Sequence, residues 1–270
     1  MIDRVTNILA IETTDQCGSV ALFSGGDLLV ERVLPSSMRS AKTLAPAIDE
    51  ILRESQLLPS DIGKVAVIIG PGSFTGLRVG VVTANVFAYA VGAEVIGLST
   101  FEVIAFNCML AGLWGVFSIG VDAQRGEVVV QDWSVDSSGN YFCLTDAMLL
   151  MSVDDWQQHS KSFQIPEIEN GIATLQSGSS ATKSTVHNDC DVVCCQNFTF
   201  AGPALRRFGA KFSGVVQVTS DDLFEPRAGA AARLAQNKLP TSDVWTTTPI
   251  YSRPSAADEK RNLKSQKPDT

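Results

Sequence analysis

The clearest chemical signature in the chain is a glycine-rich segment, Gly70-Pro71-Gly72-Ser73-Phe74-Thr75-Gly76-Leu77-Arg78-Val79-Gly80. It joins an apolar run that predicts a buried strand, residues 65–69, to one that predicts a helix, residues 74–91. Glycine permits a tight turn here, and Ser73 can cap the helix, whose first N–H groups then face the end of the strand. Such a helix N-terminus favours anions, so Gly70, Gly72, Ser73 and Arg78 are candidate phosphate contacts.

The two common phosphate-binding motifs do not fit this segment. A Walker loop ends in Gly-Lys-Ser/Thr, whereas this one ends in Gly76-Leu77-Arg78 and lacks the lysine. The dinucleotide motif G-x-G-x-x-G needs its third glycine one residue earlier. A glycine turn that only seats a helix on a sheet therefore stays open as the alternative to a phosphate site.

Side chains at the ends of two predicted strands could also do chemistry. Glu12 could help to hold magnesium through water and Thr13 could contact a phosphate, but a solvated carboxylate is the simpler explanation of Glu12. Asp122 takes the matching place later in the chain. The chain has two histidines, His159 and His187, both in polar surroundings, which argues against a Ser-His-Asp hydrolase or a histidine-ligated metal.

The helix predicted at residues 74–91 has one charged residue, Arg78, and apolar residues on every side. Such a helix must be buried all round, in a large core or against another chain. The apolar stretch within it is shorter than the roughly 20 residues of a membrane span, so we expect no membrane segment. An amphipathic helix precedes it at residues 43–55, because Pro46 is tolerated only in a first turn that starts near Thr43.

Composition narrows the class of protein. The chain has 270 residues, 45% hydrophobic and 19% charged, which is enough for two lobes. Its net charge of −8 argues against binding nucleic acid unaided. The N-terminus does not resemble a signal peptide, so we expect a cytoplasmic protein with free thiols. Cys190, Cys194 and Cys195 lie close together but lack the C-x-x-C pair of a zinc site.

The order of predicted elements is that of a ribonuclease-H-like lobe. Strands at 8–13, 19–23 and 28–34 form a meander, and parallel βα units follow it. Residues 117–133 repeat the N-terminal strand, acidic residue, glycine and strand, which indicates a duplicated lobe, with chance similarity of two hairpins as the alternative. We predict an α/β fold with an N-terminal lobe at residues 1–106 and a reduced second lobe at residues 107–254. A disordered tail is expected at residues 255–270. Within the second half we expect a loop at residues 176–189, a strand at residues 191–195 and a helix at residues 224–238.

Several segments resemble the TsaB family, also called YeaZ. They are residues 8–14, 19–22, 44–50, 98–102, 121–128 and 249–253, and the most specific is Gly-Pro-Gly-Ser-Phe-Thr-Gly at 70–76. The resemblance implies an actin-like (ASKHA) fold with two ribonuclease-H-like lobes. It also implies a non-catalytic scaffold in the complex that transfers a threonylcarbamoyl group to N6 of adenosine 37 in tRNA.

The same resemblance implies partners and a contact surface. Expected partners are TsaD in a heterodimer, TsaE, and a second copy when the chain is alone. Contact with tRNA is expected only through the complex, and ATP or ADP with magnesium only at its interface. The resemblance assigns the contact to the helices at 43–55 and 74–91, with candidate residues Leu44, Ile48, Ile51, Leu52, Phe74, Leu77, Val81, Phe87 and Val91.

The resemblance also implies that catalysis is absent. The metal-binding H-x-x-x-H of TsaD falls at Thr100 and Ile104, neither of which is a histidine. Ser40 replaces a frequent histidine, and a glycine-rich segment is reduced to Ala201-Gly202-Pro203-Ala204, which puts a nucleotide pocket in doubt. The alternatives are an ASKHA-type small-molecule kinase that uses Glu12 and Asp122, and a homodimeric binding module unrelated to tRNA.

Overall fold

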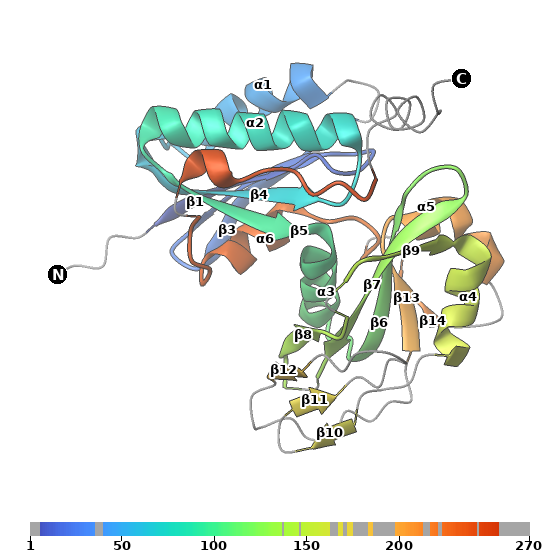
Figure 1. Cartoon of the computed structure of the whole chain (residues 1–270). Helices are drawn as coiled ribbons and strands as arrows, with labels where there is room; N and C mark the ends of the chain where they lie inside the picture. The colour runs from blue at the N-terminus through green and yellow to red at the C-terminus, as the bar shows by residue number, and fades with distance from the viewer. Residues whose placement is uncertain are drawn as a thin grey trace, which may run out of the picture.

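The computed structural model describes residues 6–35, 40–136, 138–145, 147–162, 167–169, 172–174, 183–185, 198–212, 217–220, 223–241 and 243–253. Figure 1 shows two lobes, each built on its own β-sheet. A small separate sheet joins β10 (Glu167–Glu169), β11 (Ile172–Thr174) and β12 (Lys183–Thr185).

The first sheet has the strand order β3-β2-β1-β4-β5. Its strands are β1 (Asn7–Glu12), β2 (Ser19–Ser24), β3 (Asp27–Val33), β4 (Ile62–Gly70) and β5 (Glu94–Ser99). The first three strands are antiparallel, whereas β1, β4 and β5 run parallel. Because successive residues of a strand point to opposite faces, Leu9 and Ile11 enter one core while Ile8 and Ala10 enter another.

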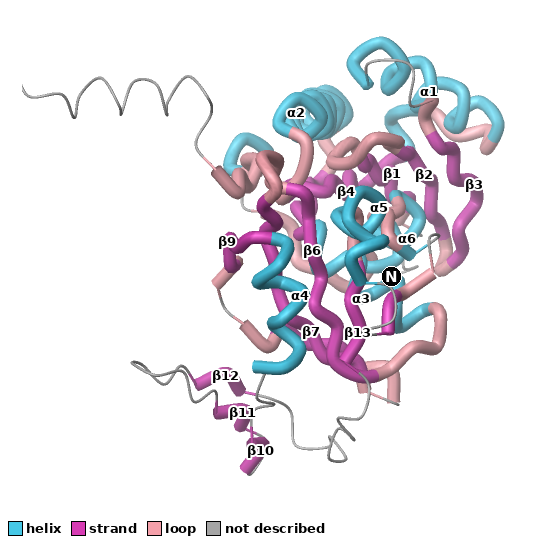
Figure 2. The backbone as a smooth tube through the Cα atoms, turned by 90° about the vertical axis from the view of Figure 1, so that its right-hand side faces the viewer, coloured by secondary structure: helices cyan, strands magenta, loops and turns pink. Residues whose placement is uncertain are grey.

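Helices cover both faces of this sheet (Figures 1 and 2). On one face lie α1 (Ser40–Glu54) and α2 (Phe74–Val91), which share a core with β1 and β4. On the other face lies α6 (Ala228–Ala235). The bounds of α2 are those predicted, with Ser73 as its N-cap and Gly92, at a φ of 74°, as its C-cap.

The second sheet repeats the plan of the first. Its strand order is β14-β13-β6-β7-β8, and β9 also pairs with β7. Read from β8, the strands β8, β7, β6, β13 and β14 take the places of β3, β2, β1, β4 and β5 in the first sheet. The strands are β6 (Gly115–Asp122), β7 (Glu127–Val135), β8 (Tyr141–Cys143), β9 (Leu149–Ser152), β13 (Phe198–Ala201) and β14 (Gln217–Val218). The predicted duplication is confirmed, and the fold is an actin-like α/β fold with two ribonuclease-H-like lobes.

The second lobe is the smaller in its helices. After β13 it has α5 (Ala204–Phe208), with 5 residues, where the first lobe has α2, with 18. A second helix, α4 (Val153–Ser162), packs on β7 through the fully buried Trp156. This difference agrees with the predicted reduction of the second lobe.

The predicted starts of two helices were wrong. The first helix begins at Ser40 rather than Thr43 and keeps Pro46 inside it. Pro46 lies on the exposed side, where water can bond the carbonyl that proline leaves without a donor. The last helix begins at Ala228 rather than Phe224, because a residue that precedes proline, here Glu225, is disfavoured in the helical conformation.

The chain crosses between the lobes more often than the predicted boundaries assume. A cut at residue 106 falls inside α3 (Thr100–Leu110), which contributes Phe106 to the core of the first lobe and Ile104 to that of the second. The chain then returns to the first sheet, where α6 packs and where Ile250 N donates to Ile69 O. The predicted strand at 191–195, the cysteine cluster, the tail and, apart from β12, the loop at 176–189 lie outside the described residues.

Candidate functional site

The glycine-rich segment lets α2 lie directly on the end of β1. A Cβ added at Gly72 would lie 2.5 Å from the backbone oxygen of Thr14, and one at Gly76 would lie 1.8 Å from that of Thr13. A Cβ at Gly80 would lie 2.2 Å from Thr13 Oγ1. No side chain fits at such distances, so these glycines serve close packing of helix on strand. The seating role that the sequence left open is therefore the one supported by the geometry.

The N-terminus of α2 already uses part of its hydrogen-bonding capacity within the chain. Ser73 N donates to Thr14 O at 2.7 Å, and Ser73 Oγ accepts from Gly76 N at 3.4 Å. Gly70, with a φ of 118°, turns the chain before the cis bond to Pro71. An anion at this helix end would have fewer free N–H donors than an uncapped helix offers.

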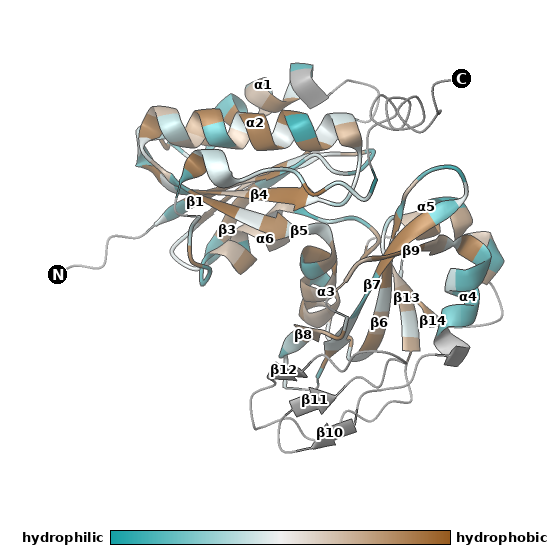
Figure 3. Ribbon diagram, viewed as in Figure 1, coloured by the Kyte–Doolittle hydropathy of each residue, from teal (hydrophilic) through white to brown (hydrophobic). Residues whose placement is uncertain are grey.

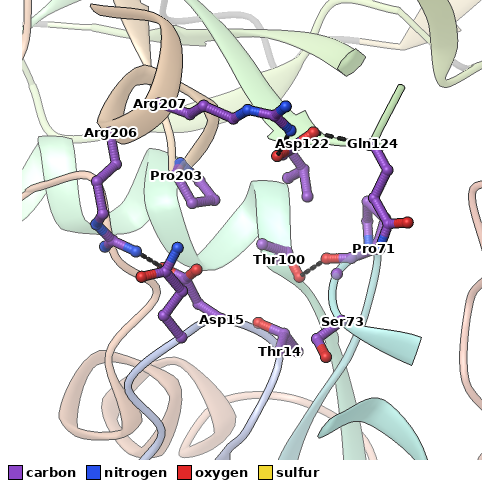
Figure 4. A pocket seen from close by; sticks show the side chains of 13 residues that line it. Thr14, Asp15, Pro71, Ser73, Thr100, Asp122, Gln124, Pro203, Arg206 and Arg207 are labelled. Atoms are coloured by element: carbon purple, nitrogen blue, oxygen red, sulfur yellow. Dashed lines mark hydrogen bonds and ion pairs between the residues drawn. The ribbon is translucent and has the colours of Figure 1, made fainter. Parts of the chain in front are cut away.

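A cleft of about 510 Å³ lies between the lobes at this helix end (Figure 4). The first lobe and the start of α3 line it with Thr14, Asp15, Gln16, Pro71, Gly72, Ser73 and Thr100. The second lobe lines it with Val121, Asp122, Gln124, Pro203, Arg206 and Arg207.

Two neighbouring arginines of α5 enter the cleft, and carboxylates hold both (Figure 4). Arg206 pairs with Asp15 at 2.9 Å and with Glu225 at 2.6 Å, so it ties the second lobe to the first. Burial opposes the charge of Arg206, but the two carboxylates outweigh burial and raise its pKa. Arg207 pairs with Asp122 at 3.0 Å. An anionic ligand in this cleft would have to compete with these pairs.

Glu12 is absent from the lining of the cleft. Its side chain is fully buried, and its Oε1 accepts hydrogen bonds from the backbone N–H and, at 2.7 Å, the hydroxyl of Thr14. Burial raises the pKa of Glu12 to about 8, although the bonds from Thr14 act in the opposite direction. A carboxyl that is largely protonated at neutral pH is a poor magnesium ligand. Thr13 is also buried and donates to Gly76 O at 2.8 Å, so neither residue suits the predicted phosphate or metal contact.

The structure brings together only part of the predicted phosphate site. Gly72 and Ser73 line the cleft. Gly70 instead lies against the backbone of Ile250, whose oxygen would be 2.5 Å from an added Cβ. Arg78 is exposed on α2, where its guanidinium lies over the ring of Phe74.

Sequence reasoning missed Thr100, Gln124, Arg206 and Arg207 as cleft residues. Two adjacent arginines, which follow Gly202-Pro203 after Ala204 and Leu205, were a usable signal. Their partners were not predictable, because Asp15 lies 191 positions from Arg206 in the sequence.

The two positions at which the resemblance places the metal histidines of TsaD, Thr100 and Ile104, are occupied by structural residues. Thr100 Oγ1 donates to Pro71 O at 2.6 Å, and Ile104 is buried in the core of the second lobe. Among the residues that the structure describes, no group of three His, Cys, Asp or Glu side chains could hold a metal ion.

Comparison with known proteins points to one family. A family model described as TsaD, tRNA N6-adenosine threonylcarbamoyltransferase, matches residues 33–236. The tRNA threonylcarbamoyladenosine biosynthesis protein TsaB of Bacillus subtilis is 31% identical over 121 residues, which are 45% of this chain and 52% of that protein. TsaB of Escherichia coli is 33% identical over 137 residues, which are 49% of this chain and 57% of that protein. The chain belongs to the TsaB (YeaZ) family.

A solved TsaB-family structure shows the same fold over nearly the whole chain. YeaZ from Pseudomonas aeruginosa superposes with a TM-score of 0.66 at 17% identity, covering 91% of this chain and 99% of that one. The sequence matches to the two TsaB proteins, by contrast, span only about half of their lengths.

Most of the predicted interface residues lie inside the lobe of this TsaB-family chain. Six side chains are 5% exposed or less and belong to the buried core, namely Leu44, Ile48, Ile51, Leu52, Leu77 and Val81. The other three, Phe74, Phe87 and Val91, are half-buried. These side chains cover the first sheet, which would otherwise expose its apolar face, so a partner cannot reach the six buried ones.

The exposed apolar surface of α2 is carried by other residues. Val82, Val86 and Tyr89 are 60%, 51% and 69% exposed, and their spacing places them on one face of the helix. Burial inside the lobe therefore does not account for all sides of α2, and burial of this face against another chain stays a prediction. By length and hydropathy (Figure 3) α2 could cross a membrane. Seven of its residues, however, are buried within the lobe. We call the face formed by Val82, Val86 and Tyr89 the α2 stripe.

Proposed function

We propose that this chain is a non-catalytic subunit of the complex that transfers a threonylcarbamoyl group to N6 of adenosine 37 in tRNA. In this proposal it binds and activates TsaD, and TsaE joins the pair. Membership of the TsaB family supports a role in threonylcarbamoyladenosine biosynthesis. The docking role rests on one observation, the exposed α2 stripe. A monomer seldom leaves neighbouring large apolar side chains so exposed on one helix unless another chain covers them.

Three features of the described residues support a non-catalytic role. Glu12 is buried with a raised pKa, Ile104 has no donor atom for a metal, and both cleft arginines are paired with carboxylates. We place ATP or ADP and magnesium at the interface of the complex rather than in a site of this chain alone. With a net charge of −8, the chain would meet tRNA through its partners in the cytoplasm.

Size-exclusion chromatography with purified TsaD tests the docking role. We expect the wild type to co-elute with TsaD, and Val82→Glu and Val86→Glu to elute apart from it while keeping the wild-type melting temperature. Leu239→Glu, at a position 91% exposed beyond α6, is the matched control and should co-elute. Co-elution of both α2 variants would refute the assignment of the stripe.

Calorimetry with ATP and magnesium separates this proposal from the small-molecule kinase alternative. We expect the isolated chain to show neither tight binding nor turnover. Tight binding with hydrolysis in the absence of TsaD would favour the kinase.

A further inference from the structure

The C-terminal segment, residues 243–253, lies along α2 and meets both of its ends. Trp245 packs on Tyr89 with ring centroids 5.5 Å apart, near the end of the helix. Tyr251 stacks on Phe74 at its start, with centroids 4.1 Å apart and ring planes 17° from parallel. Between them Asn85 Nδ2 donates to the backbone oxygen of Thr247 at 3.1 Å. The surface around the α2 stripe therefore comes from two parts of the chain.

Arg78 is held in one orientation at the start of this surface. Its guanidinium lies 4.7 Å from the centre of the Phe74 ring and 5.8 Å from that of Tyr251. Its Nε donates to Tyr251 Oη at 3.1 Å. Two aromatic rings and one hydrogen bond thus fix the side chain before any partner arrives.

The charge of Arg78 is not neutralised within the part of the chain that the structure describes, where Arg78 forms no ion pair. Other described arginines do pair with carboxylates, namely Arg32, Arg53, Arg206, Arg207, Arg227 and Arg253. With Nε bonded to Tyr251, the two terminal nitrogens of Arg78 have no acceptor among these residues. A guanidinium in this state can take a carboxylate through two parallel hydrogen bonds.

Arg78 shares its helix face with the α2 stripe. The steps from Arg78 to Val82, Val86 and Tyr89 are four, four and three residues, which keep side chains on one face. At 1.5 Å per residue the row is about 16 Å long. It has a cationic start, an aliphatic middle and an aromatic end that Trp245, 53% exposed, extends.

We propose that Arg78, oriented by Phe74 and Tyr251, sets the specificity of this face by pairing with a carboxylate on the docking surface of the partner. The inference rests on the proposed function, because it takes the partner to be TsaD. The apolar row supplies area that many helices could cover, whereas a fixed guanidinium accepts only a partner with an acidic side chain at the matching place. Pairing at one end of the row also fixes the direction and register of the docked element.

The test is the dissociation constant of the full chain with TsaD at low and high salt. We expect Arg78→Gln to weaken binding about tenfold or more and to flatten the salt dependence. Arg78→Lys should recover only part of the affinity, since it keeps the charge but loses the fork and the stacking. Tyr251→Leu should weaken binding while leaving Arg78 charged. Arg233→Gln, at an exposed arginine of α6 on the opposite face of the sheet, is the control and should bind as the wild type does.

The outcomes separate this inference from the function it rests on. A wild-type chain that does not bind TsaD overturns both. A wild-type complex whose affinity and salt dependence are unchanged by Arg78→Gln overturns the role of Arg78 alone. If Arg78→Gln dissociates a homodimer but leaves TsaD binding intact, the occupant is a second copy and the proposal is wrong.

Discussion

Replacing Gly76 by alanine should destabilise the protein, although the same change usually stabilises a helix. In a helix interior, alanine is favoured over glycine by about 1 kcal/mol. Here the new Cβ would lie 1.8 Å from the carbonyl oxygen of Thr13, which is backbone and cannot rotate away. Helix α2 must then move off β1 by about 1 Å or more, and overpacking of this kind costs about 1–3 kcal/mol or more. Because the obstructing atom is backbone, we take the upper end of this range, about 3 kcal/mol, and subtracting the helix gain of about 1 kcal/mol leaves a net loss of about 2 kcal/mol.

Thermal unfolding measures this loss. For a domain of 150–250 residues, 1 kcal/mol shifts the melting temperature by about 2–4 °C, so Gly76→Ala should lower it by about 4–8 °C. Gly209→Ala is the control, because an added Cβ there meets nothing within 4 Å, and its melting temperature should stay near that of the wild type.

Combining Thr13→Ala with each glycine substitution distinguishes obstruction by a side chain from obstruction by the backbone. Thr13→Ala removes the hydroxyl that obstructs Gly80→Ala, so it should offset the cost of that change but not the cost of Gly76→Ala, which meets the backbone. A Gly76→Ala variant as stable as the wild type, or equal rescue of both variants by Thr13→Ala, would refute the packing role of these glycines.

Three further predictions concern Glu12, Arg206 and Val81. Burial raises the pKa of Glu12 from 4.5 to about 8, so the folded state binds the extra proton and stability falls as pH rises through this range. Glu12→Gln has no such carboxyl group. The melting temperature of the variant minus that of the wild type should therefore increase from pH 5 to pH 8 and stay constant at higher pH. Arg206→Gln removes the partner of Asp15 and leaves Glu225 with Arg227 alone, and it should cost about 1–3 kcal/mol in urea unfolding, between the values for exposed and buried pairs. Val81→Glu places a charge in the core, where the native side chain is 3% exposed, and should prevent folding. Val82→Glu, at a position 60% exposed, should leave the melting temperature in thermal unfolding unchanged.

The sequence was sufficient for the architecture because local patterns determine it. Alternating strands and a strongly apolar helix gave the order of elements in the first lobe, and α2 has the bounds that its serine cap predicts. The repeated hairpin at residues 117–133 gave the second lobe. The return of α6 to the first sheet was not predictable, because it depends on pairing between segments about 200 residues apart, such as the bond from Ala228 N to Ser19 Oγ.

The candidate site was predicted less well, for a physical reason. Periodicity shows that α2 is apolar on all sides, but it does not show which side meets the sheet. Val81 and Val82 are the same residue type at neighbouring positions, yet Val81 is buried and Val82 is exposed. The role of the glycines was equally hidden, since phosphate binding and close packing both require residues without a side chain. Distances to Thr13 and Thr14 favour packing.

The most direct test of the central claim is the affinity of TsaD for the wild type and for Val82→Glu, measured by titration calorimetry. We predict a stoichiometric complex with the wild type, loss of at least tenfold in affinity with Val82→Glu, and wild-type affinity with Leu239→Glu. Equal affinity for all three chains would contradict the claim that this TsaB-family protein docks its partner through the exposed face of α2.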